Sequence, residues 1–113
     1  MDESGHWRAV RHQQAWDRFM EAERLELENR RNGHLRKLLG DPLPGESPGE
    51  LERLASEDET RAEQGLLSLM NPDGEIIYKH INDITPEDRT ARITAEGAQV
   101  EWVAERTRAR DSS

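Results

Sequence analysis

The four histidines are the residues of this chain best suited to bind a metal ion or to move a proton at neutral pH. No two of them are three or four residues apart, and neither an HxxE nor an HExxH motif is present. The chain has no cysteine, which excludes thiolate ligands, cysteine nucleophiles and disulfides. We therefore expect no bound metal ion and no cofactor. The histidines are His6, His12, His34 and His80.

Nucleophilic catalysis also lacks its sequence motifs. The chain has no GxSxG elbow and no phosphate-binding glycine-rich loop. Tyr78, Lys79 and His80 are consecutive, and consecutive residues of a helix point in different directions, so a concerted role for them is not expected. The sequence therefore does not predict an enzyme.

Acidic residues are concentrated in the middle of the chain, whose net charge is −8. Residues 41–75 hold ten acidic and two basic side chains, whereas the rest holds fourteen of each. Direct nucleic-acid binding is not expected, because phosphate binding needs a net basic surface. A dense set of carboxylates can instead mimic phosphates and occupy a basic groove of another protein. The candidate acidic face consists of Glu57, Asp58, Glu59 and Glu63.

The elements that carry these residues are predicted to be helices. Residues 4–31 contain no proline and mostly strong helix formers, and Asn32-Gly33 is a typical helix stop. Ser47-Pro48 and Thr85-Pro86 each combine an N-cap residue with proline at the first helical position. An apolar stripe of helical period predicts that the helix beginning at Pro48 continues to about Met70.

Asn71-Pro72-Asp73-Gly74 fits either the turn of a β-hairpin or the start of a helix. The apolar residues and the histidine that follow are spaced i, i+1, i+4, i+5 and i+8, which is helical spacing rather than the alternation of a strand. We therefore predict a helix that starts at Pro72. Residues 90–104 fit a helix capped by Thr85 or a β-hairpin that turns on Glu96-Gly97, and we favour the helix.

These patterns predict an all-α protein with a long N-terminal helix, a Pro/Gly linker and then about three helices. The alternative is an α+β protein with a C-terminal β-hairpin at residues 90–104. Residues 1–40 are expected to form the N-terminal helical segment, residues 41–49 the linker and residues 50–113 the C-terminal helical region. All three are expected to belong to one structural unit.

A shortage of core residues favours a binding function. Leu, Ile, Val and Phe make up 20 of the 113 residues, which is few for a charged chain that folds unaided. The first helix is apolar on two faces, and tryptophan is enriched in interface hot spots. We expect a non-enzymatic assembly subunit that buries apolar helix faces against another protein or a second copy of itself. The predicted partner-binding residues are Trp7, Val10, Leu25 and Trp102.

The alternative function is of a different class, an acidic inhibitor of phage or mobile-element type that blocks a basic nucleic-acid-binding surface with the acidic face. No apolar run approaches the roughly 20 residues of a membrane span, and the N-terminus lacks the apolar stretch of a signal peptide. We therefore expect a cytoplasmic protein with no membrane partner.

Overall fold

The computed structural model describes residues 3–112, with side chains from residue 9 onward. Within these residues it contains four α-helices, a β-hairpin and two short 3-10 helices, so the all-α prediction is wrong and the chain is an α+β protein. The alternative named the right class, but its hairpin at residues 90–104 is absent because that segment is helical. The elements are α1 (Glu3–Arg31), α2 (His34–Leu39), α3 (Pro48–Glu63), β1 (Leu66–Met70), β2 (Ile76–His80), η1 (Ile81–Asp83), η2 (Pro86–Asp88) and α4 (Arg89–Asp111).

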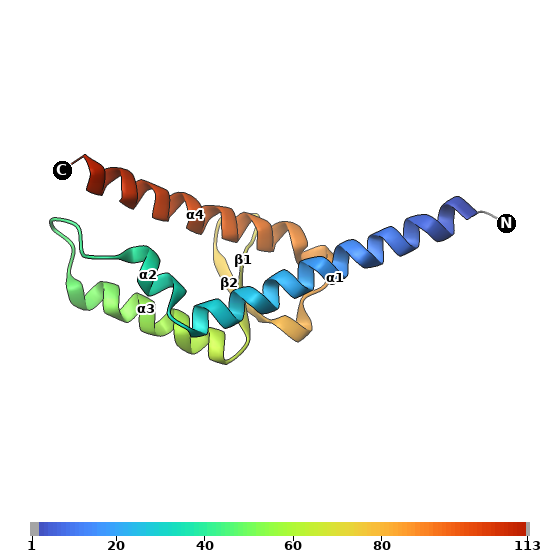
Figure 1. Cartoon of the computed structure of the whole chain (residues 1–113), viewed down its shortest axis with the longest axis horizontal. Helices are drawn as coiled ribbons and strands as arrows, with labels where there is room; N and C mark the ends of the chain where they lie inside the picture. The colour runs from blue at the N-terminus through green and yellow to red at the C-terminus, as the bar shows by residue number, and fades with distance from the viewer. Residues whose placement is uncertain (1–2, 113) are drawn as a thin grey trace.

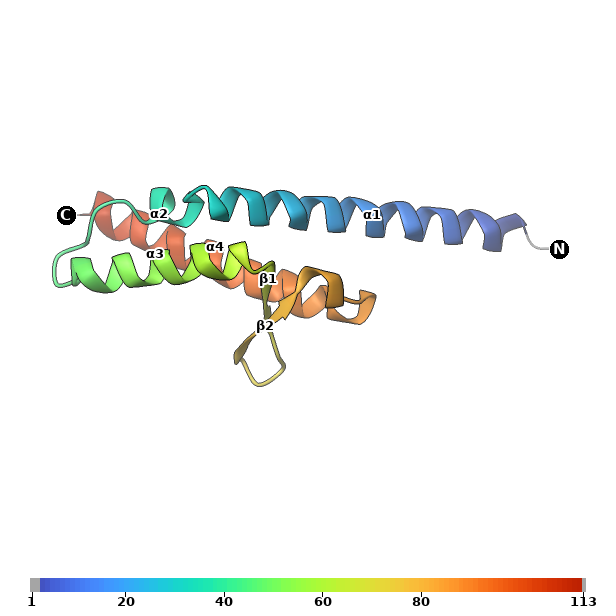
Figure 2. The same cartoon turned by 90° about the horizontal axis from the view of Figure 1, so that it is seen from below.

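The described residues form an elongated molecule with extents of 65 × 30 × 26 Å. Helices α3 and α4 lie on either side of α2 and the C-terminal half of α1 (Figure 1). The hairpin projects from the helices on the side away from α1, and the N-terminal half of α1 extends beyond all other elements (Figure 2). That half of α1 has few tertiary neighbours, so its helical form depends on its strong helix formers.

Three of the predicted helix boundaries are confirmed. Helix α1 ends at Arg31, and Gly33 then adopts the left-handed conformation with φ of 84°. Helix α3 begins at Pro48 after the N-cap residue Ser47. Thr85 precedes η2 and α4, and the Asp88 carboxylate accepts hydrogen bonds from the Thr85 backbone N–H at 2.9 Å and from its hydroxyl at 3.0 Å. Local capping chemistry therefore located these boundaries correctly, with the short helix η2 between Thr85 and α4.

The turn of the hairpin lies where a helix start was predicted, so the prediction at Pro72 is wrong. The side-chain oxygen of Asn71 accepts hydrogen bonds from the backbone N–H of Asp73 at 3.1 Å and of Glu75 at 2.9 Å. Gly74 has a φ of 85°, a conformation that is easy for glycine and incompatible with the first turn of a helix. The asparagine side chain thus stabilises the turn in place of a helix N-terminus.

The isoleucine spacing that resembled a helix arises from a strand followed by a turn. Ile76 and Ile77 belong to β2, which pairs antiparallel with β1 and places Ile77 opposite Leu69. Ile81 begins η1, and Ile84 follows it and is buried in the core. These isoleucines therefore have helical spacing in the sequence although they belong to an extended strand and the tight turn that follows it.

Helix α3 ends at Glu63 and does not continue to Met70 as predicted. Gly65 has a φ of 76°, and a Cβ atom at this position would lie 2.7 Å from Nε2 of His80. The positive φ favours glycine, and a larger residue would also require the His80 ring to shift. Gly65 thus turns the chain from α3 into β1. The apolar residues that seemed to extend the helix are in β1, where Leu67 and Leu69 are buried.

The core consists of two separate clusters of buried apolar residues. The larger cluster joins α1, α3 and the hairpin, and three half-buried residues of α1 pack against it. The smaller joins α2 to α3. The larger contains Leu27, Ala62, Leu67, Leu69 and Ile84, covered by Trp16, Phe19 and Met20. The smaller contains Leu35, Leu39, Leu51 and Ala55. Such a small apolar core makes the polar contacts between elements important.

The hydrogen-bond pattern shows which backbone groups of the hairpin face outward. The Ile81 N–H donates to the Gly65 carbonyl and the Asn71 N–H to the Glu75 carbonyl, each at 2.9 Å. Pairs of this kind recur at every second residue of an antiparallel ladder. Alternate residues of β1 therefore direct their backbone groups away from β2. These residues are Leu66, Ser68 and Met70.

Two buried arginines close this outer edge of β1. Arg30 of α1 donates a hydrogen bond from Nη1 to the Leu66 carbonyl at 2.9 Å, and Arg92 of α4 donates from Nη1 to the Ser68 carbonyl at 3.3 Å. The guanidinium groups take the place of a neighbouring strand, so this edge is not free to pair with another chain.

Candidate partner-binding surfaces

Three buried arginines connect the elements that frame the surface grooves of the molecule. Arg30 of α1 bonds Asp58 of α3 at 3.0 Å, and Arg92 of α4 bonds Glu23 of α1 at 2.7 Å. Arg106 of α4 bonds a carboxylate in the loop before α3. Because a buried charge that loses its partner is costly, these pairs hold α1, α3 and α4 in fixed relative positions.

The acidic cluster around Arg92 is the one group of residues in the described chain whose spacing suits a metal ion. Carboxylate oxygens of Glu23, Glu26 and Glu96 lie within 4.8 Å of one another. Arg92 bonds both Glu23 and Glu26 and thus supplies the positive charge that the cluster needs. Burial outweighs the effect of Arg92 and raises the pKa of Glu23 to about 7. We therefore assign the cluster a structural role in stabilising the contact between α1 and α4.

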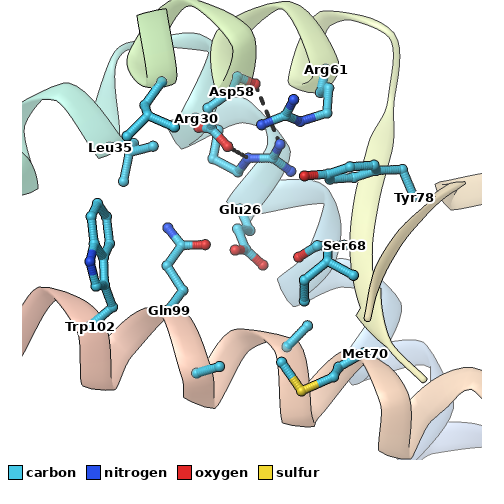
Figure 3. A pocket seen from close by; sticks show the side chains of 14 residues that line it. Glu26, Arg30, Leu35, Asp58, Arg61, Ser68, Met70, Tyr78, Gln99 and Trp102 are labelled. Atoms are coloured by element: carbon cyan, nitrogen blue, oxygen red, sulfur yellow. Dashed lines mark hydrogen bonds and ion pairs between the residues drawn. The ribbon is translucent and has the colours of Figure 1, made fainter. Parts of the chain in front are cut away.

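The first groove, here called the hairpin groove, lies between α3, α4 and the hairpin and has a volume of about 300 Å³. Trp102 rises from α4 on one side and Tyr78 lies on the other (Figure 3). The guanidinium carbon of Arg61 lies 4.5 Å from the centre of the Tyr78 ring, a cation–π contact. The apolar wall contains Leu35, Leu54, Met70, Ile76, Tyr78 and Trp102.

The floor of the hairpin groove contains two buried polar atoms that lack a hydrogen-bond partner within the described residues. They are Oδ2 of Asp58 and Nε of Arg61. Burial raises the pKa of Asp58, although its other oxygen bonds Arg30. Both atoms are covered by protein, so an occupant of the groove does not reach them without movement of α3. The groove thus presents a mainly apolar surface.

The second groove, here called the helical groove, lies between α1, α2 and α4 and has a volume of about 460 Å³. Leu25 of α1 is 56 % exposed and Val100 of α4 is 64 % exposed. Leu38 of α2 and Val103 of α4 complete its apolar surface. Single exposed apolar side chains are normal on a protein surface, but the convergence of several in one concave surface is typical of a binding site.

The structure distributes the predicted partner-binding residues over different surfaces. Leu25 lines the helical groove and Trp102 lines the hairpin groove, so they do not form one site. Val10 is half-buried and lies in the projecting half of α1. The side chain of Trp7 lies outside the described residues.

The residues of the acidic face are largely paired with arginines. Glu57, Asp58 and Glu59 each bond an arginine side chain, at 2.7, 3.0 and 3.0 Å respectively, and Asp58 is buried. Glu63 is exposed and has no ion pair within the described residues. Carboxylates that are neutralised in this way do not form a continuous anionic surface, so the geometry does not favour nucleic-acid mimicry.

Lys79 and His80, which looked reactive beside Tyr78, have structural contacts. The Lys79 ammonium bonds the Asp88 carboxylate at 2.7 Å and lowers the pKa of that group. Nδ1 of His80 accepts a hydrogen bond from the backbone N–H of Asn82 at 3.0 Å. Neighbouring strand residues also point to opposite faces, so Lys79 is directed away from the other two.

The sequence reasoning missed Leu38 and Val100 as candidate binding residues. Val100 and Val103 are three residues apart on a helix, so their shared face was visible in the sequence. Their exposure was not visible, because it depends on how far α4 stands from α1 and α2 in the fold.

Comparison with known proteins gives no match: no family model fits the sequence, and no similar curated protein or solved structure is found. No helix within residues 3–112 is long and apolar enough to cross a membrane.

Proposed function

We propose that this protein is a non-enzymatic binding subunit whose helical groove receives an amphipathic helix of another protein or of a second copy of the chain. The observation that carries the proposal is the exposure of Leu25 and Val100, 56 % and 64 %, on two helices that face one groove. Burial of such side chains is the main favourable term in protein association.

The two long walls of the groove have the periodicity that a third helix requires. Helix α1 contributes residues 22, 25, 26 and 29, and α4 contributes residues 96, 99, 100 and 103. Each set follows i, i+3, i+4 and i+7, which is the stripe that one helix presents to another. A helix laid between the two stripes packs its own apolar side chains against both.

The rim of the groove indicates the charge of the partner. Glu96 borders the apolar centre, together with the polar side chains of Asn29 and Gln99. Glu26 also lies at the rim, but Arg92 already forms an ion pair with it. A partner helix with an apolar face flanked by Lys or Arg complements this rim. Since the centre is apolar, binding is expected to depend only weakly on salt.

The test compares Val100→Asp and Leu25→Asp with Thr94→Asp, a matched change of a β-branched residue at an exposed position of α4 outside the groove. Each immobilised variant is incubated with extract of the source cells, and captured proteins are identified by cross-linking and mass spectrometry. Loss of one buried aliphatic contact weakens binding by about tenfold. We expect the two groove variants to lose the captured partner and Thr94→Asp to retain it.

Two other outcomes would identify the partner as a second copy or refute the proposal. If sedimentation shows that the chain associates with itself and Val100→Asp abolishes the association, the groove binds a second copy. If all three variants capture the same proteins with equal yield, the helical groove is not the binding site and the proposal fails.

A further inference from the structure

The outer edge of β2 is open, in contrast to the outer edge of β1. The alternation of the ladder directs the backbone N–H and C=O groups of Ile76 and Tyr78 away from β1. No residue of the described chain forms a hydrogen bond with these groups. Unpaired amide groups along a strand edge are a template for the addition of another strand.

The side chains along this edge are also exposed. Ile76, Ile77 and Tyr78 are 42 %, 46 % and 45 % exposed, although all three are large. The hairpin projects away from the helices, so the edge is accessible from the side (Figure 2). A two-stranded hairpin is marginally stable in water, and further strands would bury these side chains.

We propose that β2 pairs antiparallel with β2 of a second copy of this chain, so that the two hairpins form one four-stranded sheet. Ile77 lies on the two-fold axis of this arrangement. Ile76 of each copy lies opposite Tyr78 of the other, and each such pair exchanges two backbone hydrogen bonds. The same patch of both chains forms the contact, as a closed two-fold dimer requires.

Charge complementarity selects this register and identifies the occupant as a second copy. With Ile77 on the axis, Glu75 of each chain lies opposite Lys79 of the other, on the same face of the sheet. A shift of one hydrogen-bonding step in either direction places Glu75 opposite an isoleucine instead, opposite Ile77 or Ile81. A lysine on an edge strand usually discourages pairing, but here Lys79, which also bonds Asp88 of its own chain, meets a carboxylate that has no other ion pair within the described residues.

The test is sedimentation equilibrium of the whole chain over a micromolar to millimolar range, combined with amide hydrogen exchange. We expect a monomer–dimer equilibrium in which exchange of the Ile76 and Tyr78 amides slows as concentration rises. Glu75→Lys places like charges opposite each other twice per dimer and weakens dimerisation by about tenfold or more. Ile76→Pro removes an outward N–H at the first residue of the strand, where proline is tolerated, and has the same effect.

A charge-swap experiment gives the sharpest result. Glu75→Lys and Lys79→Glu each create like-charge contacts in a homodimer, but a mixture of the two variants restores opposite charges at both positions. We expect each variant alone to be weakened and the mixture to form heterodimers. Lys79→Glu also removes the ion pair with Asp88, so circular dichroism is used to check that each variant is folded. Ile76→Pro gives an independent answer if Lys79→Glu is not folded.

The proposal is overturned if the native chain is monomeric at all concentrations, or if it dimerises with unchanged affinity in Glu75→Lys and Ile76→Pro. A dimer that resists both changes but is lost in Val100→Asp assembles through the helical groove. That result refutes the edge contact and leaves the proposed function intact. The two surfaces share no residue, so their failures are distinguishable.

Discussion

Replacement of Arg92 by methionine is the most informative single change for the architecture. Arg92 is the largest fully buried side chain of the described residues, with 1 % exposure. It donates hydrogen bonds to the carboxylates of Glu23 and Glu26 in α1 and to the backbone carbonyl of Ser68 in β1. One side chain of α4 therefore contacts both α1 and β1. Methionine fills much of the same volume without charge or hydrogen-bond donors.

The expected loss of stability follows from the carboxylates of Glu23 and Glu26, which remain without their arginine partner. Removal of one partner of a buried ion pair costs about 3–5 kcal/mol, because the other charge stays uncompensated. The whole free energy of unfolding of a small domain is about 5–15 kcal/mol, so Arg92→Met retains little stability at pH 8. The loss is smaller in acid, because burial already raises the pKa of Glu23 to about 7 and loss of Arg92 raises it further.

The assay is urea unfolding followed by circular dichroism, at pH 8 and at about pH 5 where a carboxyl with a raised pKa is protonated. The matched control is Arg108→Met on the same helix, whose exposed ion pair with Glu101 is worth about 0–1 kcal/mol. Adding Glu23→Gln to Arg92→Met neutralises one stranded charge, and we expect it to recover part of the loss at pH 8. Equal unfolding free energies for Arg92→Met and Arg108→Met at pH 8 would refute the reasoning.

Three further changes test individual contacts. Burial raises the pKa of Glu23 in the folded state, so its contribution to the free energy of unfolding is greatest below pH 4.5 and falls as the pH rises to about 7. Glu23→Gln should remove about 3 kcal/mol of this pH dependence, which is measured by unfolding at several pH values. Gly65→Ala should lower the free energy of unfolding in urea by about 1–3 kcal/mol, because φ is 76° and a Cβ there lies 2.7 Å from the His80 ring. Gly45→Ala is the control and should cost less, since Gly45 has a similar φ but no neighbour within 4 Å. Thr85→Ala removes the hydroxyl of the capping box at η2, directly before α4, and should cost about 1 kcal/mol. An unchanged melting temperature would show that this hydroxyl does not stabilise the start of these helices.

The parts of the fold that the sequence revealed are those set by short-range chemistry. Helix starts at Pro48 and near Thr85 follow from an N-cap residue beside a proline, and the end of α1 follows from Asn32-Gly33. The hairpin was missed because Asn71-Pro72 also resembles a helix start. The deciding features were Gly65 and Gly74, two glycines with positive φ, of which the first precedes β1 and the second lies in the turn between β1 and β2.

The ion pairs of the buried arginines could not be predicted from sequence patterns. Arg92 and Glu23 are 69 residues apart in sequence, and nothing in either neighbourhood marks one as the partner of the other. A charged residue also usually indicates a solvent-exposed position, so neither residue stands out in the sequence as part of the core. Leu25 and Trp102 were recognised as exposed apolar candidates from composition and helical faces, but their separation into two grooves depends on the placement of α4.

The guanidinium groups that cover the edge of β1 have a consequence for aggregation. Growth of a fibril from β-hairpins requires every unit to accept a neighbour on both sides, so that the sheet extends without limit. In the proposed dimer the hairpin accepts a neighbour through β2 only, because Arg30 and Arg92 already bond the Leu66 and Ser68 carbonyls of β1. We therefore expect the addition of strands to terminate after one step, so that two side chains on the opposite border of the hairpin protect its exposed isoleucine-rich edge from polymerisation.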